Sequence, residues 1–369
     1  MTIKASGTSL AFSEIATEFG YPTDNKFGNY RISQSIGALS NKPLDNGIPQ
    51  SGEIKFSDFY SKSLNVVVNC HSTNEANGGA QEERVNAKTD KWNNNFVTVV
   101  GGFRNKKQSG SKIIIHVNKK FGSEPNNNQN VCALTTGTWS GIEGLQVDMG
   151  ASGVISGAGG KGGDGDDGYG NVGPVRHPHP NADKANGSWN GKPGNSGLGI
   201  EYNPTTVNVP AGNIQCGYGG GAAGRGSRSD EVSDRTACPG GGGGGAGLPG
   251  GAAGEGGRRR SHGSDEVAAG SDGNVGTLYG GGAGGAGGDN DEESIACNGG
   301  DGRDTESVGV PDCSDGPGND DSVGWYYTNG SAGANGAAIR RITGYTVNVN
   351  VSGSGSVDGS QTATGVANN

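Results

Sequence analysis

Glycine returns at a period of three along residues 247–258, which read Gly247-Leu248-Pro249-Gly250-Gly251-Ala252-Ala253-Gly254-Glu255-Gly256-Gly257-Arg258. The same period runs through residues 159–167 and 281–289. It fits neither the α-helix nor the β-strand, but it fits the polyproline-II helix, which has about three residues per turn and no internal hydrogen bonds. Two bare positions per turn would let such helices pack side by side, with the third side chain pointing outward. The pattern therefore predicts a stack of glycine helices.

Composition separates this glycine-rich part from a more ordinary first part. Sixty of the 76 glycines lie after residue 150, and only 30% of the 369 residues are apolar. Glycine at this density is also typical of flexible, low-complexity chain, because glycine loses the most entropy on folding. A flexible linker has no reason to keep a phase of three. We therefore expect ordered glycine helices rather than disorder.

Charge and cysteine content argue against several kinds of site. The formal net charge is −9, whereas nucleic-acid binding needs a basic surface, so no nucleic-acid partner is expected. The six cysteines show no CxxC spacing, and the acidic run 164–168 departs from the spacing of a calcium loop, so we expect no metal and no cofactor. Free thiols are expected, although a disulfide joining Cys297 to Cys313 would close one charged insert. Residues 1–7 lack the apolar run of a secretion signal, and no membrane insertion is expected.

Two regions precede the glycine runs. In residues 1–64 the phrase Phe12-Ser13-Glu14 returns as Phe56-Ser57-Asp58. Each serine is expected to cap a short helix whose first turn holds the acidic residue. Residues 65–156 are rich in β-branched residues between Gly, Asn and Ser turns, which predicts an all-β domain.

An internal repeat joins the β-rich part to the glycine-rich part. Residues 147–160 align with residues 207–220, and a looser copy begins at Val347. Each copy is interpreted as a strand, a tight turn and a second strand, that is, a hairpin that would seal the margin of the glycine region. The expected fold is mainly β, with a small N-terminal module and a polyglycine-II helix sandwich capped by β-hairpins. The expected domains are 1–64, 65–156, 157–340 and a C-terminal β cap at 341–369.

The inserts between glycine runs are the predicted binding loops. They lie at about 171–196, 225–239, 258–275 and 289–332, and the motif Ser-Asp-Glu-Val occurs in two of them, which suggests that they leave one end of the stack. The candidate receptor-binding residues are Trp189, Arg258, Arg259, Arg260, Trp325, Tyr326 and Tyr327. The scaffold glycines are Gly159, Gly162, Gly241, Gly244, Gly247, Gly250, Gly281, Gly284 and Gly287. No catalytic constellation is found, so we expect no enzyme.

The glycine runs resemble those of the distal tail-fibre adhesins of T-even-type contractile-tailed phages. The residues that carry this likeness are Gly157–Gly170, Gly217–Gly226, Gly240–Gly257, Gly280–Gly288 and Gly333–Gly336. In that family, glycine-rich motifs form packed polyglycine-II helices whose intervening loops bind a bacterial surface receptor. The two N-terminal phrases look like short modules at the start of tail and baseplate proteins of marine phages.

The resemblance implies a phage virion protein assembled in the host cytoplasm. Residues 1–64 would attach to other tail or baseplate proteins, and the loops would bind a host surface protein or glycan. The alternative is a purely structural virion protein of the baseplate, collar or capsid surface, without a receptor. A weaker hypothesis is a depolymerase acting on host polysaccharide. A homotrimer is possible in principle, since phage fibres are commonly trimeric, and the sequence has no heptads to decide it.

Overall fold

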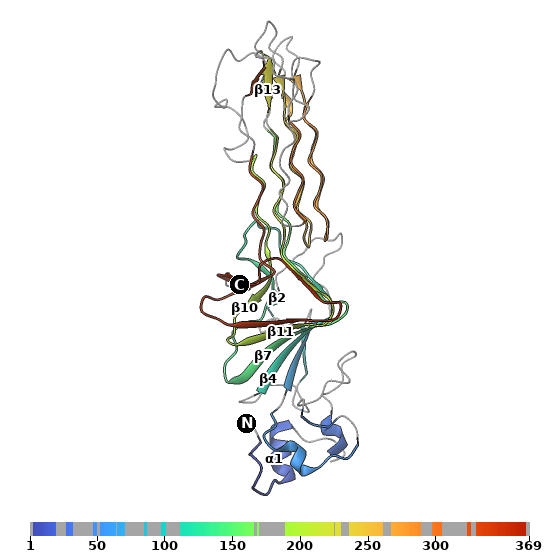
Figure 1. Ribbon diagram of the computed structural model, residues 1–369, viewed down its shortest axis with the longest axis vertical. Helices are drawn as coiled ribbons and strands as arrows, with labels where there is room; N and C mark the ends of the chain where they lie inside the picture. Colours follow the sequence, from blue (N-terminus) through green and yellow to red (C-terminus); the bar gives the residue numbers. More distant parts are fainter. Residues whose placement is uncertain are drawn as a thin grey trace.

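Three β-sheets, built almost wholly from parallel strands, lie between a small N-terminal part and a long bundle of glycine-rich segments (Figure 1). The computed structural model describes residues 3–19, 27–31, 47–49, 52–63, 65–70, 85–86, 97–100, 111–165, 168–169, 189–224, 226–229, 236–260, 267–288, 297–304, 323–325 and 330–366.

The chain visits the three sheets in turn, as in a three-sided solenoid. The first sheet has the order β19-β11-β7-β4-β1-β3, the second β20-β12-β8-β5 and the third β2-β6-β10-β18-β21. From β4 onward the chain passes from first to second to third sheet four times, ending with β19, β20 and β21. The described pairings in these sheets are parallel except that of β1 with β3. The expectation of a mainly β fold is confirmed.

The strands of the solenoid are β1 (Asn65–Cys70), β2 (Val85–Asn86), β3 (Val97–Val100), β4 (Ser111–Val117), β5 (Lys120–Phe121), β6 (Cys132–Thr135), β7 (Ile142–Met149), β8 (Val154–Ser156), β10 (Ser196–Ile200), β11 (Thr205–Val209), β12 (Asn213–Gln215), β18 (Ile339–Arg341), β19 (Val347–Val351), β20 (Ser356–Asp358) and β21 (Ala363–Thr364).

Aliphatic side chains stack in register inside this solenoid. Strand β7 alternates between half-buried or exposed and buried residues, as expected when one face of a strand meets the core. Val147 pairs with Val207, which pairs with Val349, so equivalent positions of the three sequence repeats lie side by side. The repeat found in the sequence is therefore the stacking unit of the fold.

The expectation that each repeat is a hairpin is wrong. Strands β7 and β8 belong to different sheets, and each pairs in parallel with strands of other coils. The tight turn at Gly150–Gly153 is a corner of the solenoid, where a Cβ at Gly153 would collide with the backbone of the preceding coil at Val117. A hairpin and a solenoid corner share the same local sequence, and only the partner strand, some 60 residues away, distinguishes them.

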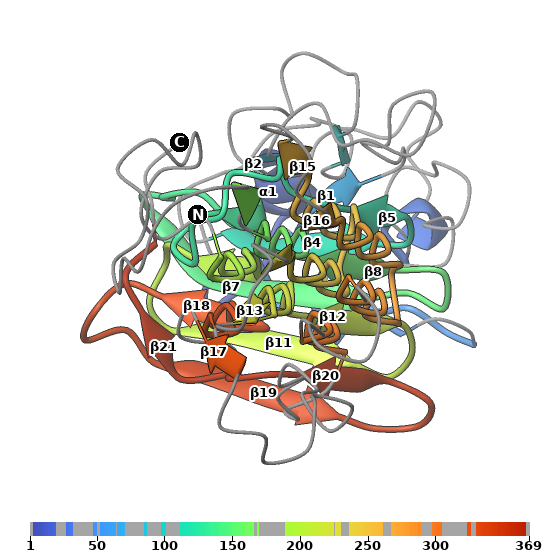
Figure 2. The same cartoon turned by 90° about the horizontal axis from the view of Figure 1, so that it is seen from above.

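Above the solenoid, nine glycine-rich segments of the described chain run side by side (Figure 1, Figure 2). They carry hydrogen bonds between segments at every third residue: Gly159, Gly162 and Gly165, for example, donate to Pro249, Ala252 and Glu255 at 2.7–2.9 Å. The segments leave the solenoid after a strand of the second sheet and return to the third sheet, so they are insertions at one corner. They comprise residues 157–165, 189–195, 217–224, 238–248, 249–257, 270–277, 280–288, 297–303 and 330–336.

Segment 238–248 lies at the centre of the bundle. Its N–H groups donate in rotation to three neighbours, with Gly240 bonded to Cys297, Gly241 to Ser271 and Gly242 to Gly163. Three further segments donate to its carbonyl groups, so it is surrounded on all sides. No position in its turn faces solvent, which explains why glycine is unbroken from 240 to 245 while outer segments carry a side chain at every third residue. In outer segment 280–288 these are the exposed Ala283 and Ala286.

The N-terminal part packs on the solenoid rather than standing apart. Its elements are α1 (Phe12–Phe19), η1 (Phe27–Arg31) and η3 (Phe56–Phe59). Phe19, Tyr30 and Phe59 are fully buried and belong to the same hydrophobic cluster as Ile113 and Ile115 of β4. Ser63 also donates to Glu143 at 2.8 Å. The small module thus gains its core by docking onto its own chain.

The predicted serine caps are wrong by two residues, whereas the acidic first turns are confirmed. Helix α1 begins at Phe12 and η3 at Phe56, so Ser13 and Ser57 lie inside the first turn. The acidic side chains reach back to the start of each helix: Glu14 accepts from the Ala11 N–H at 2.8 Å, and Asp58 from the Lys55 N–H at 2.7 Å. A carboxylate satisfies these N–H groups in place of the serine hydroxyl.

Glu14 should make the N-terminal helix sensitive to acid. The Ala11 N–H and then the Lys4 ammonium, 2.8 Å away, hold the pKa of this carboxyl below its ordinary value of 4.5. Its contribution to stability is therefore present above the unfolded pKa and is lost as the pH falls through the lower folded pKa. An NMR titration should give Glu14 a midpoint below 4.5, and Lys4→Met should raise that midpoint only in part. A Glu14 midpoint at or above 4.5 would contradict this.

Sheets cross the expected domain ranges. The third sheet takes β6 from 65–156, β10 and β18 from 157–340, and β21 from 341–369. The division of the chain remains a prediction, and these sheets connect its parts. Cys70, Cys132, Cys216 and Cys238 are buried and form no disulfide, whereas Cys297 is disulfide-bonded.

Candidate binding surface at the end of the glycine bundle

The first eight glycine segments run alternately away from and toward the solenoid, and the ninth, 330–336, runs toward it like the eighth, 297–303. Two connections at the solenoid end are short: segment 238–248 passes directly into 249–257, and segment 270–277 turns back at Thr277–Gly280, where the Thr277 amide donates to the Gly280 carbonyl. At the far end, called here the tip, the longer inserts after 165, 224, 257 and 288 begin. The expectation that inserts leave one end of the stack is met by the described residues on either side of these four.

Two small sheets close the tip. One has the order β16-β14-β13-β17 and the other pairs β15 with β9. Strand β13 sits between β14 and β17, with Ser227 opposite Ala237 and Trp325. In Figure 1 β13 marks this end, at the opposite pole of the molecule from α1. The strands are β9 (Gly168–Tyr169), β13 (Ser227–Ser229), β14 (Thr236–Ala237), β15 (Arg259–Arg260), β16 (Val267–Ala268) and β17 (Val323–Trp325).

Five of the seven predicted binding residues are brought to the tip. Trp189 begins the descending segment 189–195, and its carbonyl accepts from Ala223. Arg258 is exposed and follows segment 249–257, while Arg259 and Arg260 form β15 and Trp325 ends β17. Tyr326, Tyr327 and most of the insert residues lie outside the described residues. The insert predicted at 289–332 also contains segment 297–303, which belongs to the bundle.

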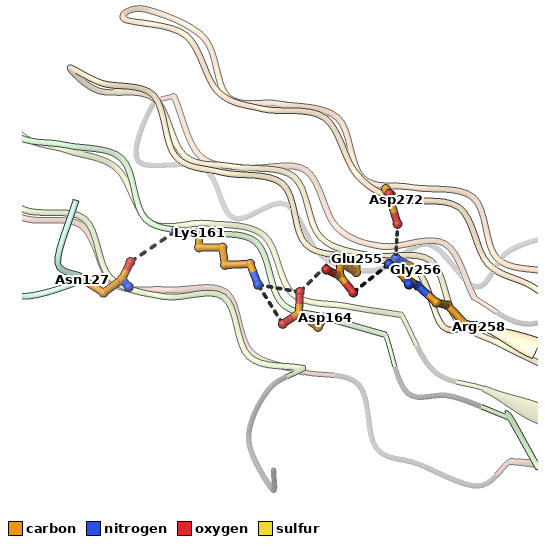
Figure 3. Close-up of polar contacts among 7 residues, drawn as sticks. All are labelled: Asn127, Lys161, Asp164, Glu255, Gly256, Arg258 and Asp272. Carbon is orange, nitrogen blue, oxygen red and sulfur yellow. Dashed lines mark hydrogen bonds and ion pairs between the residues drawn. The ribbon is translucent and has the colours of Figure 1, made fainter. Parts of the chain in front are cut away.

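A row of charged side chains runs along one edge of the bundle toward the tip (Figure 3). Lys161 pairs with Asp164 at 2.8 Å within segment 157–165, and Arg258, the residue after segment 249–257, pairs with Glu255 of that segment at 3.2 Å. Asp164 also accepts from the Glu255 N–H at 2.9 Å, which joins the two segments. These ion pairs are partly or largely exposed, so their main effect is on geometry rather than on stability.

Several acidic and amide side chains of the glycine segments bond backbone N–H groups of neighbouring segments. The carboxylate of Asp272 accepts from the Gly256 N–H at 2.8 Å, as Figure 3 shows, and Asp301 accepts from the Gly284 N–H at 2.8 Å. Asn298 and Asn335 do the same for Gly287 and Gly219. At each of these N–H groups a short polar side chain of a neighbouring segment takes the place of a backbone carbonyl. In the sequence, the signal for this role was an Asp or Asn at the third position of the glycine repeat.

The solenoid end offers a second concave region. Two adjoining cavities, of about 590 and 470 Å³, meet at Tyr279 and Asp358. Tyr279, on the turn between two segments, is 64% exposed. The floor is the outer face of the second sheet, where Gln215 donates to Ser156 at 3.0 Å and to the Leu278 carbonyl at 2.7 Å. Of the polar side chains lining it, the Ser356 hydroxyl donates to the Asn213 side-chain oxygen at 3.0 Å.

Within the described residues, no group of three or more His, Cys, Asp or Glu side chains is placed to hold a metal ion. In the same part of the chain, no helix has the length and apolarity needed to cross a membrane.

No protein-family model and no curated protein matches the chain. Among solved structures, the chain is similar to the crystal structure of the gp37-gp38 adhesin tip complex of the bacteriophage S16 long tail fiber. The identity is 15%, the alignment covers 95% of this chain and 100% of the other, and the TM-score is 0.36. A TM-score of this size does not establish a shared fold.

Proposed function

We propose that the chain is a phage tail-fibre or tail-tip adhesin that binds a host bacterial surface receptor through the tip of its glycine bundle. The observation that carries the proposal is the tip itself, where four long inserts begin on a scaffold held by backbone hydrogen bonds. Loops on a rigid scaffold are the usual place for recognition. The assignment to phages rests on the resemblance of the glycine runs and of the N-terminal phrases.

The glycine segments are, in this proposal, polyglycine-II helices. The three-residue period of their hydrogen bonds and the donation of segment 238–248 in three directions support that geometry. Such a bundle is stiff although glycine-rich, because N–H groups at every third residue are bonded to neighbouring segments. A stiff bundle keeps the tip loops in position, so that binding does not have to order the scaffold as well.

The two ends of the molecule suit two different roles, attachment to the virion and binding of a receptor. The described residues of the range 1–64 lie at one pole and the tip at the other, with the solenoid between them (Figure 1). An adhesin needs this separation, because one end must hold other tail or baseplate proteins while the other reaches the cell. We propose attachment through the N-terminal part, a virion location and no enzymatic activity.

Replacing tip inserts should abolish binding without unfolding the protein. We expect a labelled chain with residues 261–266 and 289–296 exchanged for Gly-Ser links of equal length to lose at least about tenfold in affinity for intact host cells, since hot spots concentrate in few residues. The matched control exchanges residues 343–346, a turn of the solenoid far from the tip, and should bind normally. Equal melting temperatures would show that all three proteins are folded.

The alternative, a purely structural virion protein, predicts no cell binding by any form. Immunogold labelling of intact particles separates the two, because an adhesin tip must be exposed at the distal end of a fibre. A chain that binds cells after the exchange but loses binding in Tyr279→Ala would move the site to the cavities at the solenoid end. Release of reducing ends from host polysaccharide would contradict the absence of enzymatic activity.

A further inference from the structure

Among the described residues, the strands of the fourth coil each form an outer edge of their sheet. Strands β19, β20 and β21 are each terminal in their sheets, so among the described residues no strand pairs with their outer edges. An open edge of parallel sheet presents unpaired N–H and carbonyl groups to any strand that fits. Proteins that remain single chains usually protect such an edge with lysine, proline or a bulge.

Strand β19 has none of these protections. It reads Val347-Asn348-Val349-Asn350-Val351, without charge or proline, and it pairs with β11 over five consecutive residues without a bulge. Val351, in line with the inward-facing valines, is 48% exposed. An apolar, regular edge of this kind is a binding surface or an aggregation hazard.

The side chains on the outer face of the edge form an unfinished ladder. The side-chain amide of Asn208 donates to the Asp148 carboxylate at 2.9 Å, and the side-chain amide of Asn350 donates to the side-chain oxygen of Asn208 at 3.0 Å. Each of these two asparagines donates one hydrogen bond to the preceding coil, and Asn350 presents its own side-chain oxygen at the open edge. The next strand should therefore offer a donor at this position.

The sequence of β19 is also a palindrome, and this feature favours a second copy of the chain as the partner. Reading from either end gives Val-Asn-Val-Asn-Val, centred on Val349. Two copies paired antiparallel about a twofold axis through Val349 would place Val opposite Val, and Asn350 opposite the partner's Asn348. Each outward asparagine would then meet an amide that can both donate and accept. An isologous interface requires such self-complementarity, whereas an unrelated strand does not.

We propose that the chain forms a twofold dimer through antiparallel pairing of β19 with β19 of a second copy. The first sheet would then continue across the axis, and the inward valines of the two open coils would cover each other. The dimer is independent of the receptor proposal. If both hold, each dimer carries two tips, and simultaneous contact would raise the apparent affinity for a cell.

Charge reversal at the outward positions tests this pairing. One double variant carries Asn348→Lys and Asn350→Lys, and the other carries Asn348→Asp and Asn350→Asp. Because each position faces the other in the partner, each variant meets only like charges with itself and should be about tenfold or more weakened as a dimer. Mixing the two should restore a dimer of one lysine and one aspartate chain. Residues 348 and 350 are exposed, so the fold should survive.

Analytical ultracentrifugation of the intact chain gives the readout. The chain has a mass of 36.9 kDa, and the unmodified protein is expected at twice this mass at micromolar concentration. The control variant Asn118→Lys, on a solenoid turn away from the edge, should remain dimeric. A single-chain mass for the unmodified protein, a mass of three chains, or double variants that dimerise as well as the unmodified protein would overturn the proposal.

Discussion

Replacing Gly244 with valine is expected to leave no folded protein. Gly244 lies in the middle of the central segment 238–248, and a Cβ there would stand 2.5 Å from the carbonyl carbon of Gly251 and nearer still to its oxygen, whereas real Cβ contacts essentially never fall below 3.0 Å. The segment cannot move aside, because Gly244 donates to Asn274 at 2.9 Å on one side and accepts from Gly282 at 2.7 Å on another.

The size of the effect follows from how much must be displaced. Overpacking an ordinary core costs about 1–3 kcal/mol, and here the neighbouring backbone hydrogen bonds, each about 1 kcal/mol, are lost as well. Several such bonds approach the whole stability of a domain, about 5–15 kcal/mol. Circular dichroism and soluble yield measure the loss. Ala286→Val, at an exposed third position of segment 280–288, is the matched control and should cost little. Gly284→Val, in the same outer segment, should fall between the two.

A Gly244→Val protein that melts like the control would exclude close backbone packing at the centre of the bundle. The Gly284→Val variant tests whether the loss at Gly244 comes from its central position or from replacing any glycine of the bundle. A Cβ at Gly284 would also collide with the Gly299 backbone, but segment 280–288 lies on the outside and can shift toward solvent. A graded series from Ala286 through Gly284 to Gly244 is therefore the expected signature of a surrounded central segment.

The period of glycine predicted that the segments exist but not how they are arranged. Each run repeats the same local pattern of two glycines per turn, so the sequence does not say which run lies beside which. The one distinguishing signal was the unbroken glycine from 240 to 245, which marks the segment without an outward face. Its meaning follows from the six surrounding segments, which come from distant parts of the chain.

The solenoid was missed for a related reason. The repeat at 147, 207 and 347 was visible in the sequence, and its copies do stack in register. Strand, turn and strand in one copy satisfy the local rules of a hairpin equally well. The partner that decides between them lies one coil away, and here one coil includes a long glycine insertion. Large insertions therefore make the period of such repeats difficult to recognise in the sequence.

The candidate binding surface was predicted in outline only. The motif Ser-Asp-Glu-Val, shared by two inserts, predicted one displaying end. The backbone role of Asp272, Asp301 and Asn298 was not predicted, because an acidic residue at an exposed position looks the same whether it faces water or a neighbouring N–H group. Which inserts touch a receptor depends on residues that the scaffold does not constrain.

Asn195→Leu is expected to weaken the joint between the solenoid and the bundle. The Asn195 side chain is 1% exposed, and its amide nitrogen donates to the Ser123 hydroxyl at 2.9 Å while its oxygen accepts from the Asn128 N–H at 3.1 Å. Its backbone bonds two glycine segments, donating to Ala158 at 2.9 Å and accepting from Gly217 at 2.8 Å. One residue thus fixes where the bundle leaves the solenoid.

Leucine has a similar volume but leaves the buried Ser123 hydroxyl without its Asn195 partner, at about 1–3 kcal/mol, whereas Asn128 is exposed and its N–H can bond water instead. We expect the free energy of unfolding in urea to fall by about 1–3 kcal/mol. The control is Asn190→Leu, because Asn190 also bonds a backbone N–H, that of Ser331 at 2.7 Å, but at a half-exposed site where water can replace it. Its cost should stay below about 1 kcal/mol. Equal costs at the two sites would mean that burial at the joint contributes nothing, and that the bundle is anchored by its backbone hydrogen bonds alone.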